Sequence, residues 1–265
     1  MKAQSTSSFP TKDDILSWFR RGEFNKSPGA MASFAPQGPS VDWDTDLEET
    51  IRRDEVCLID VRSPFEFEED HLHQAINWPV LNNEERHIVG TLYKSYGQEK
   101  ALAAALHFSE HKFSELEEFI RHDGRPPLIY CYRGGARSKA TCFFLEKRDL
   151  SPLRLNGGYK HYRSQVCEYF KGSQFQTLIN ISGISGTGKT RILHGLRGRL
   201  PIIDFEEYAQ HSGSVFGSIP FLQENQWKKV PQCLFESKVY WAMQQPRPIF
   251  CEDESIRIGS NHIPK

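Results

Sequence analysis

Two absences limit what this 265-residue chain can be. No apolar run approaches the ~20 residues of a membrane-spanning helix, and the N-terminal stretch MKAQSTSSFPTKDD lacks the apolar core of a signal peptide. The six cysteines form no C-x-x-C pair, which argues against a disulfide scaffold or a cysteine-bound structural metal. We therefore expect a cytoplasmic protein with free thiols, no membrane partner and no metal held by cysteine.

The chain also has little net charge. The formal net charge is -1, with 38% hydrophobic and 25% charged residues, so the composition is that of a globular protein. Any site for a polyanion must then be a local patch. At about 100 to 200 residues per domain, the length favours two domains.

Periodicity divides the chain into three parts. Residues 1–40 are rich in Ser, Pro and Gly and predict a mobile extension, in which DDILSWFRR could form one helix. Residues 41–171 alternate short apolar strands with helical segments, which predicts a parallel-sheet α/β domain. The expected elements there are strands at 56–61 and 127–131, helices at 112–120 and 138–148, and a strand, glycine turn and helix start across 153–163.

Residues 172–265 predict a second α/β unit. A β-branched strand at 175–183 precedes a glycine-rich loop and an amphipathic helix, and two further strand candidates lie in LPIIDFEEYA and RPIFCEDES. About 90 residues is small for a nucleotide-binding domain, so we expect this unit to be incomplete.

The glycine-rich loop GISGTGKT fits the P-loop pattern G-x-x-x-x-G-K-[ST]. Its glycines let backbone N–H groups surround phosphate oxygens, its lysine neutralises their charge, and its threonine can reach Mg²⁺. The candidate phosphate-binding residues are Gly183, Ser185, Gly186, Thr187, Gly188, Lys189 and Thr190. Asp204, Glu252 and Asp253, at the ends of the two further strands, are candidate acidic partners. The pattern does not specify the ligand.

A second loop, in PPLIYCYRGGARSKAT, places Cys131 directly after an apolar strand. The helix N-terminus and the arginines that follow favour thiolate over thiol, which makes Cys131 a candidate nucleophile. The candidate anion-binding residues after it are Tyr132, Arg133, Gly134, Gly135, Ala136, Arg137 and Ser138.

Three interpretations of this loop stay open on its residues alone. The C-x5-R spacing from Cys131 to Arg137 matches cysteine-dependent phosphatases, although Tyr130 stands where those enzymes commonly have His. The same loop suits sulfur or selenium transfer, in which the thiolate carries the chalcogen and the loop amides hold the anion. A buried, inert cysteine is the third possibility.

Upstream, CLIDVRSPFEFEEDHLHQAINWPV resembles the first motif of rhodanese-type sulfurtransferases. The resemblance implies that Asp60 and Arg62 support the mouth of the cysteine loop. The segment departs from the rhodanese pattern at Asp70, where Gly usually precedes the His, and at His73-Gln74, where Pro-Gly is common.

A rhodanese domain followed by a P-loop domain resembles the bacterial tRNA 2-selenouridine synthase family. Ser212 departs from that family, which typically has Arg in its H-R-G-S-x-F-G motif. The family also normally continues well beyond the point where this sequence ends. The segments that carry the resemblance are NNEERHIVGTLYKSYG, CYRGGARS, NGGYKHYR, ISGISGTGKT, IIDFEEYAQHSGSVFG and EDESIRIG.

The resemblance implies replacement of sulfur by selenium in 2-thiouridine at the wobble position of tRNA. The sulfur would first be alkylated by geranyl diphosphate, and selenophosphate would then supply selenium. Cys131 would handle the chalcogen, Arg133 and Arg137 would hold the anionic donor, and Gly183–Thr190 would hold the diphosphate of geranyl diphosphate or of a nucleotide. No tightly bound cofactor is expected, Mg²⁺ is a candidate ion, and selenophosphate synthetase is a candidate partner beside tRNA.

Binding of tRNA must then come from local charge and from aromatic rings that can stack on bases. The candidates are Lys94, Lys139, Lys147, Arg148, Lys160 and Arg163, with Tyr159 and Tyr162. Two other functions remain open: a sulfurtransferase or cysteine phosphatase fused to a P-loop kinase or ATPase, and a binding module without turnover.

Overall fold

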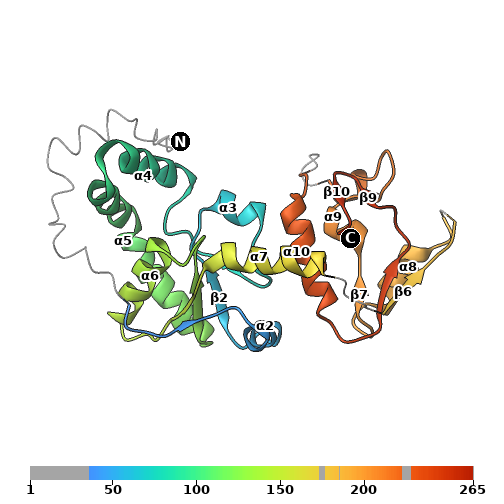
Figure 1. The fold of residues 1–265 in the computed structure, drawn as a ribbon, viewed down its shortest axis with the longest axis horizontal. Coiled ribbons are helices and arrows are strands. Elements are labelled where there is room, and N and C mark those ends of the chain that lie inside the picture. The colour runs from blue at the N-terminus through green and yellow to red at the C-terminus, as the bar shows by residue number, and fades with distance from the viewer. Residues whose placement is uncertain (1–35, 173–176, 185, 223–227, 265) are drawn as a thin grey trace, which may run out of the picture.

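The computed structural model describes residues 36–172, 177–184, 186–222 and 228–264, which form two α/β domains (Figure 1). The predicted helix in DDILSWFRR and the P-loop residue Ser185 lie outside the described residues. The predicted fold class is confirmed, because each domain is built on a parallel sheet.

The first domain contains a five-stranded sheet in the order β1-β5-β4-β2-β3, with every pairing parallel. The central strands β2 (Cys57–Asp60) and β4 (Pro127–Tyr130) are buried along their whole length. Their register pairs Asp60 with Tyr130, so the residues that follow both strands meet at one edge of the sheet. The outer strands are β1 (Ser40–Val41), β5 (Leu153–Leu155) and β3 (Ile76–Asn77).

Among the residues that the structure describes, six helices belong to this domain: α2 (Thr45–Arg52), α3 (Pro64–Glu69), α4 (Asn83–Tyr96), α5 (Gln98–Asp123), α6 (Ala136–Glu146) and α7 (Gly158–Lys171). The helix predicted at 112–120 is only the last part of α5, which has 26 residues. Within the described ranges, neither α5 nor any other helix is both long and apolar enough to cross a bilayer.

The start of the first domain differs from the prediction. Residues 37–40 were expected in the mobile extension, yet the backbone N–H groups of Gln37 and Gly38 donate to the carboxylate of Glu146. Ser40 then begins β1, which pairs with β5. The first domain therefore begins a few residues earlier than composition indicated.

The second domain has a three-stranded parallel sheet in the order β6-β8-β7. The strands are β6 (Leu178–Ile181), β8 (Ile249–Glu252) and β7 (Ile202–Ile203). The helices are α8 (Lys189–Leu196), α9 (Phe205–Ala209), a 3-10 turn at Ile219–Phe221 and α10 (Gln232–Met243). The strands β9 (Arg257–Ile258) and β10 (Asn261–His262) form an antiparallel pair.

Helix α10 lies between the two domains (Figure 1). Its Phe235 and Val239 belong to the core of the second domain, whereas Tyr240 and Trp241 belong to the core of the first. The Trp241 indole N–H donates to the Tyr162 hydroxyl at 3.0 Å. One helix thus contributes to both hydrophobic cores and fixes the domains against each other.

Candidate functional site

Cys131 directly follows β4 and is almost fully buried, with 3% of its surface exposed. Its Sγ lies 3.2 Å from the Ser138 hydroxyl oxygen, in the first turn of α6. Gly135 occupies the N-cap of that helix. The thiol is therefore held at the positive end of a helix, where an anion on the sulfur would be stabilised.

The start of α7 fixes the backbone of the cysteine loop. The Tyr159 N–H donates to the Cys131 carbonyl at 2.9 Å, and the Lys160 N–H donates to the Tyr132 carbonyl at 2.9 Å. Gly158 makes this approach possible, because a methyl group there would lie 2.1 Å from the Cys131 carbonyl oxygen. The segment NGGYKHYR thus supports the cysteine loop through two backbone hydrogen bonds.

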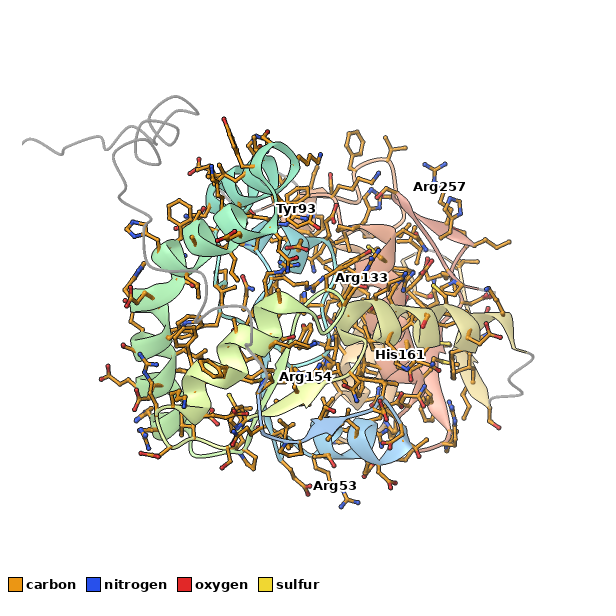
Figure 2. The ribbon with its side chains drawn as sticks, turned by 60° about the vertical axis from the view of Figure 1, so that its left-hand side comes forward. Arg53, Tyr93, Arg133, Arg154, His161 and Arg257 are labelled. Carbon is orange, nitrogen blue, oxygen red and sulfur yellow. The ribbon has the colours of Figure 1, made fainter. Side chains whose placement is uncertain are left out.

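The two arginines of the loop differ in their surroundings. Arg133 is exposed and has no carboxylate partner among the described residues; Figure 2 shows where it lies among the side chains of this domain. Arg137 forms two bonds to Glu66, at 2.6 and 3.1 Å. Burial alone would raise the pKa of Glu66, but the Arg137 guanidinium outweighs it, and Arg86 contributes too, so the pKa falls to about 2. The charge of Arg137 is therefore already compensated, and Arg133 is the open cation.

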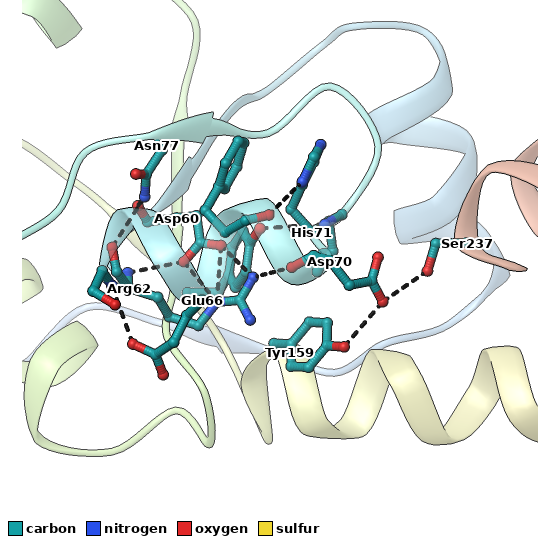
Figure 3. Close-up of polar contacts among 12 residues, drawn as sticks. Asp60, Arg62, Glu66, Asp70, His71, Asn77, Tyr159 and Ser237 are labelled. Atoms are coloured by element: carbon teal, nitrogen blue, oxygen red, sulfur yellow. Dashed lines mark hydrogen bonds and ion pairs between the residues drawn. The ribbon is translucent and has the colours of Figure 1, made fainter. Parts of the chain in front are cut away.

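The Asp60–Arg62 pair, at the end of β2, is buried (Figure 3). The Arg62 guanidinium donates to both Asp60 carboxylate oxygens and, at 2.7 Å, to the Asp70 carbonyl. Its centre also lies 4.1 Å from the centroid of the Tyr159 ring. These contacts orient β2, the β2–β3 connection and α7, and they leave neither side chain facing solvent.

Asp70, singled out in the sequence only as a departure from the rhodanese pattern, connects the two domains. Its Oδ2 accepts hydrogen bonds from the Tyr159 hydroxyl at 2.9 Å and from the Ser237 hydroxyl of α10 at 3.0 Å (Figure 3). Its Oδ1 is buried without a partner among the described residues. Burial raises the pKa of Asp70, against the effect of both hydroxyl bonds. The helix that supports the cysteine loop is thereby tied to α10.

The P-loop of the second domain connects β6 to α8. Gly186 and Gly188 have φ values of 83° and 86°, in the left-handed region that favours glycine. The Lys189 ammonium donates to the Gly183 carbonyl at 3.0 Å, and the Thr190 hydroxyl donates to Glu252 at 3.2 Å. The end of β8 therefore brings a carboxylate to the P-loop threonine, an oxygen donor set that suits Mg²⁺.

The three candidate acids occupy different positions. Glu252 meets Thr190, and Asp253 accepts from the Ser182 hydroxyl at 2.8 Å beside the loop. Asp204 caps α9 and also bonds to His194 at 2.7 Å and to Arg197 at 3.0 Å. Asp204 thus holds α8 and α9 together and makes no contact with the P-loop residues that the structure describes.

Sequence reasoning missed Glu206, which lies in the electrostatic field of the P-loop. Burial and repulsion from Glu254 and Glu252 raise the pKa of Glu206 to about 7, while Lys189 opposes the shift. A strand-end pattern could not find this residue, because Glu206 is in the first turn of α9.

The predicted RNA-binding side chains are only partly available. Tyr162 is fully buried, so the expectation that it stacks on RNA is wrong. Arg163 pairs with Glu236 of α10, and Tyr159 is half-buried against Arg62. Exposed lysines remain at four of the predicted positions, which are Lys94, Lys139, Lys147 and Lys160.

Comparison with known families agrees with both domains. Residues 44–165 match the rhodanese-like domain, and residues 176–265 match the tRNA 2-selenouridine synthase AAA domain. Over both domains the chain is similar to the tRNA 2-selenouridine synthase family.

Relatives named tRNA 2-selenouridine synthase include those of Nitrosomonas europaea (33% identical, 78% of this chain and 55% of the relative), Bdellovibrio bacteriovorus (35%, 77% and 55%) and Marinobacter nauticus (35%, 84% and 61%). The chain spans little more than half the length of these relatives. A solved N-terminal domain of a candidate ATP/GTP-binding protein from Clostridium difficile 630 is 32% identical, with a TM-score of 0.43, and covers 48% of this chain and 98% of the solved one.

We predict that Gly158→Ala disrupts the cysteine loop. The new methyl group would overlap the Cys131 carbonyl, and φ at this position is +55°, so we expect a loss of at least about 2 kcal/mol of unfolding free energy. Urea unfolding measures the loss, and mass spectrometry of iodoacetamide-treated protein measures the exposure of Cys131. Gly135→Ala is the matched control, because nothing lies within 4 Å of its added Cβ. Equal stability of the two variants would contradict this account of the loop.

We also predict that Glu206 makes stability depend on pH. Its pKa is raised from 4.5 to about 7 in the folded state, so its stabilising contribution is complete below pH 4.5 and disappears as the pH rises through about 7. Glu206→Gln should therefore be more stable than the wild type at pH 8, and the difference should shrink toward pH 4.5. Urea unfolding between pH 4.5 and pH 8 measures this difference in stability. Glu118→Gln, which alters an exposed carboxylate, is the control. A profile identical to that of the control would refute the assignment.

Proposed function

We propose that this chain acts in tRNA modification, replacing the sulfur of 2-thiouridine at the wobble position by selenium. The observation that carries the proposal is that one chain contains both a cysteine loop and a P-loop. Both loops lie within the segment that matches the relatives named tRNA 2-selenouridine synthase. A phosphatase or sulfurtransferase fused to a kinase would not require that match across both domains.

The proposed chemistry has two steps. The thiouridine sulfur displaces diphosphate from C1 of geranyl diphosphate, which makes the sulfur a better leaving group. The Cys131 thiolate then displaces geranylthiol from C2 of the base. The selenium of selenophosphate displaces Cys131 from C2 in turn, and water cleaves the Se–P bond to release phosphate.

In this proposal Cys131 acts in the selenation step from its position at the end of β4. Burial raises the pKa of Cys57 to about 11 and that of Cys142 to about 12, so these neighbouring thiols stay protonated. The Cys131 sulfur lies 3.2 Å from the Ser138 hydroxyl oxygen in the first turn of α6. The loop amides and Arg133 would hold the phosphate group of selenophosphate, with Arg137 available only if the anion competes with Glu66.

The P-loop would hold a diphosphate. Lys189 would move from the Gly183 carbonyl to phosphate oxygens, and Thr190 with Glu252 would hold Mg²⁺. Backbone N–H groups at the start of α8 would complete the cradle.

We predict that Cys131→Ser separates the two steps. Alkylation of the thiouridine does not use the Cys131 thiolate, so S-geranylated uridine should still form, whereas selenouridine should fall at least 100-fold. The assay incubates the protein with thiouridine-containing tRNA and geranyl diphosphate, then with selenophosphate, and analyses the nucleosides by mass spectrometry.

The matched control is Cys167→Ser, which alters a half-buried thiol on α7 far from the loop in sequence. It should leave both products unchanged. If wild-type protein, together with a relative spanning the whole family length, yields neither product, the proposed function fails. Turnover of phosphate esters or ATP without tRNA would instead favour the fused phosphatase or kinase.

A further inference from the structure

The first domain contains a groove that has no role in the function proposed above. It has a volume of about 900 Å³ and lies between α4, α5 and the start of α6. Ligand sites typically enclose about 300 to 1,000 Å³, so this groove is large enough for a small organic ligand.

A glycine inside a helix keeps the groove open. Gly90 lies in the middle of α4, where glycine costs up to about 1 kcal/mol relative to alanine. Close packing does not explain it, because nothing lies within 4 Å of a Cβ added at this position. The lining also includes two small residues of α5, Ala101 and Ala105, which lie one helical turn apart. Small side chains on both walls leave space that leucine would fill.

The groove is lined by both apolar and basic side chains. Val89, Leu102, Leu106 and Phe113 are among its lining residues, as are cations of α4 and α6. Those cations are Arg86, Lys94, Arg137 and Lys139. Glu66 compensates part of the charge of Arg86 and Arg137, whereas Lys94 and Lys139 have no carboxylate partner among the residues described. The site therefore complements a molecule with a hydrocarbon body and an anionic head.

The groove ends beside the cysteine loop. Its lining includes Ala136 and Arg137, which belong both to that loop and to the first turn of α6. A ligand head at this end would lie near the same helix N-terminus that faces Cys131.

We infer that this groove binds the short isoprenoid chain of an allylic diphosphate, with the diphosphate toward Lys139 and Arg137. The inference rests on the proposed function, which requires a geranyl donor. It also assigns the donor to the first domain: α4 and α5 lie on one side of α10, and β6 and α8 lie on the other (Figure 1). One geranyl diphosphate molecule cannot occupy both sites, so the P-loop is left for a nucleotide.

The test measures binding of geranyl S-thiolodiphosphate, an unreactive analogue, to the full chain by isothermal titration calorimetry. Gly90→Leu should weaken binding at least tenfold, and Gly90→Ala should weaken it less. Both variants should unfold at the same temperature as the wild type or higher, since either residue suits a helix better than glycine. Lys189→Ala, in the P-loop, should leave binding unchanged.

Loss of binding in Lys189→Ala with full binding in Gly90→Leu would overturn the inference. Absence of binding by the wild type would overturn the inference as well. That result is expected if another part of the chain or a second copy of the protein fills the groove. The nucleoside assay separates this failure from failure of the proposed function. Geranylated uridine formed equally by wild type and Gly90→Leu would refute the groove alone, whereas tight groove binding without any modified nucleoside would refute the function alone.

Discussion

Packing of α10 against both domains is the constraint on which the two proposed anion sites depend. Its aromatic residues Tyr240 and Trp241 complete the core that contains Trp43 and Tyr162, while Phe235 and Val239 complete the core under the second sheet.

Polar contacts reinforce the packing of α10, because Ser237 bonds to Asp70 and Glu236 pairs with Arg163. The cysteine loop rests on α7, and α7 rests on α10. The geometry of Cys131 therefore depends on a helix that belongs to the other domain.

The two anion sites use the same backbone device with different charge balances. Each loop follows a parallel strand and precedes a helix, so amide N–H groups and a helix N-terminus face the ligand. In the first site Glu66 already neutralises Arg137, and an incoming anion meets a pocket whose net charge is low. In the second, Glu206 and Glu254 both interact electrostatically with Lys189, so the proposed phosphate ligand would bind better with a divalent cation than alone.

Sequence patterns predicted the strands and loops because their signals are local. An apolar run followed by a cysteine or a glycine-rich loop marks a strand end whatever its surroundings, and β4, β6 and β8 lie where they were expected. Helix α10 was not predicted, since it is buried on nearly all sides and shows no polar face to set a helical period. The roles of Glu66 and Asp70 were not predicted because their partners, Arg137 and Ser237, are distant in the sequence.

The departures from the rhodanese pattern have physical correlates. Gln74, where glycine is common, has a φ of 62°, so a residue with a side chain occupies a conformation that glycine adopts more easily. Asp70 stands where the rhodanese pattern usually has glycine. Its buried carboxylate accepts hydrogen bonds from Tyr159 and Ser237 and so links the two domains. Tyr162 cannot stack on RNA as predicted, because its ring is buried in the core that also contains Tyr240 and Trp241 of α10.

Hydrogen–deuterium exchange followed through a urea titration tests the shared core most directly. The measurement compares the amides of β4 in the first domain with those of β8 in the second. If α10 completes both cores, the two strands lose protection at the same urea concentration. Loss of protection in β8 at a clearly lower concentration, with β4 and the cysteine loop still protected, would show that the domains fold independently and would contradict the account.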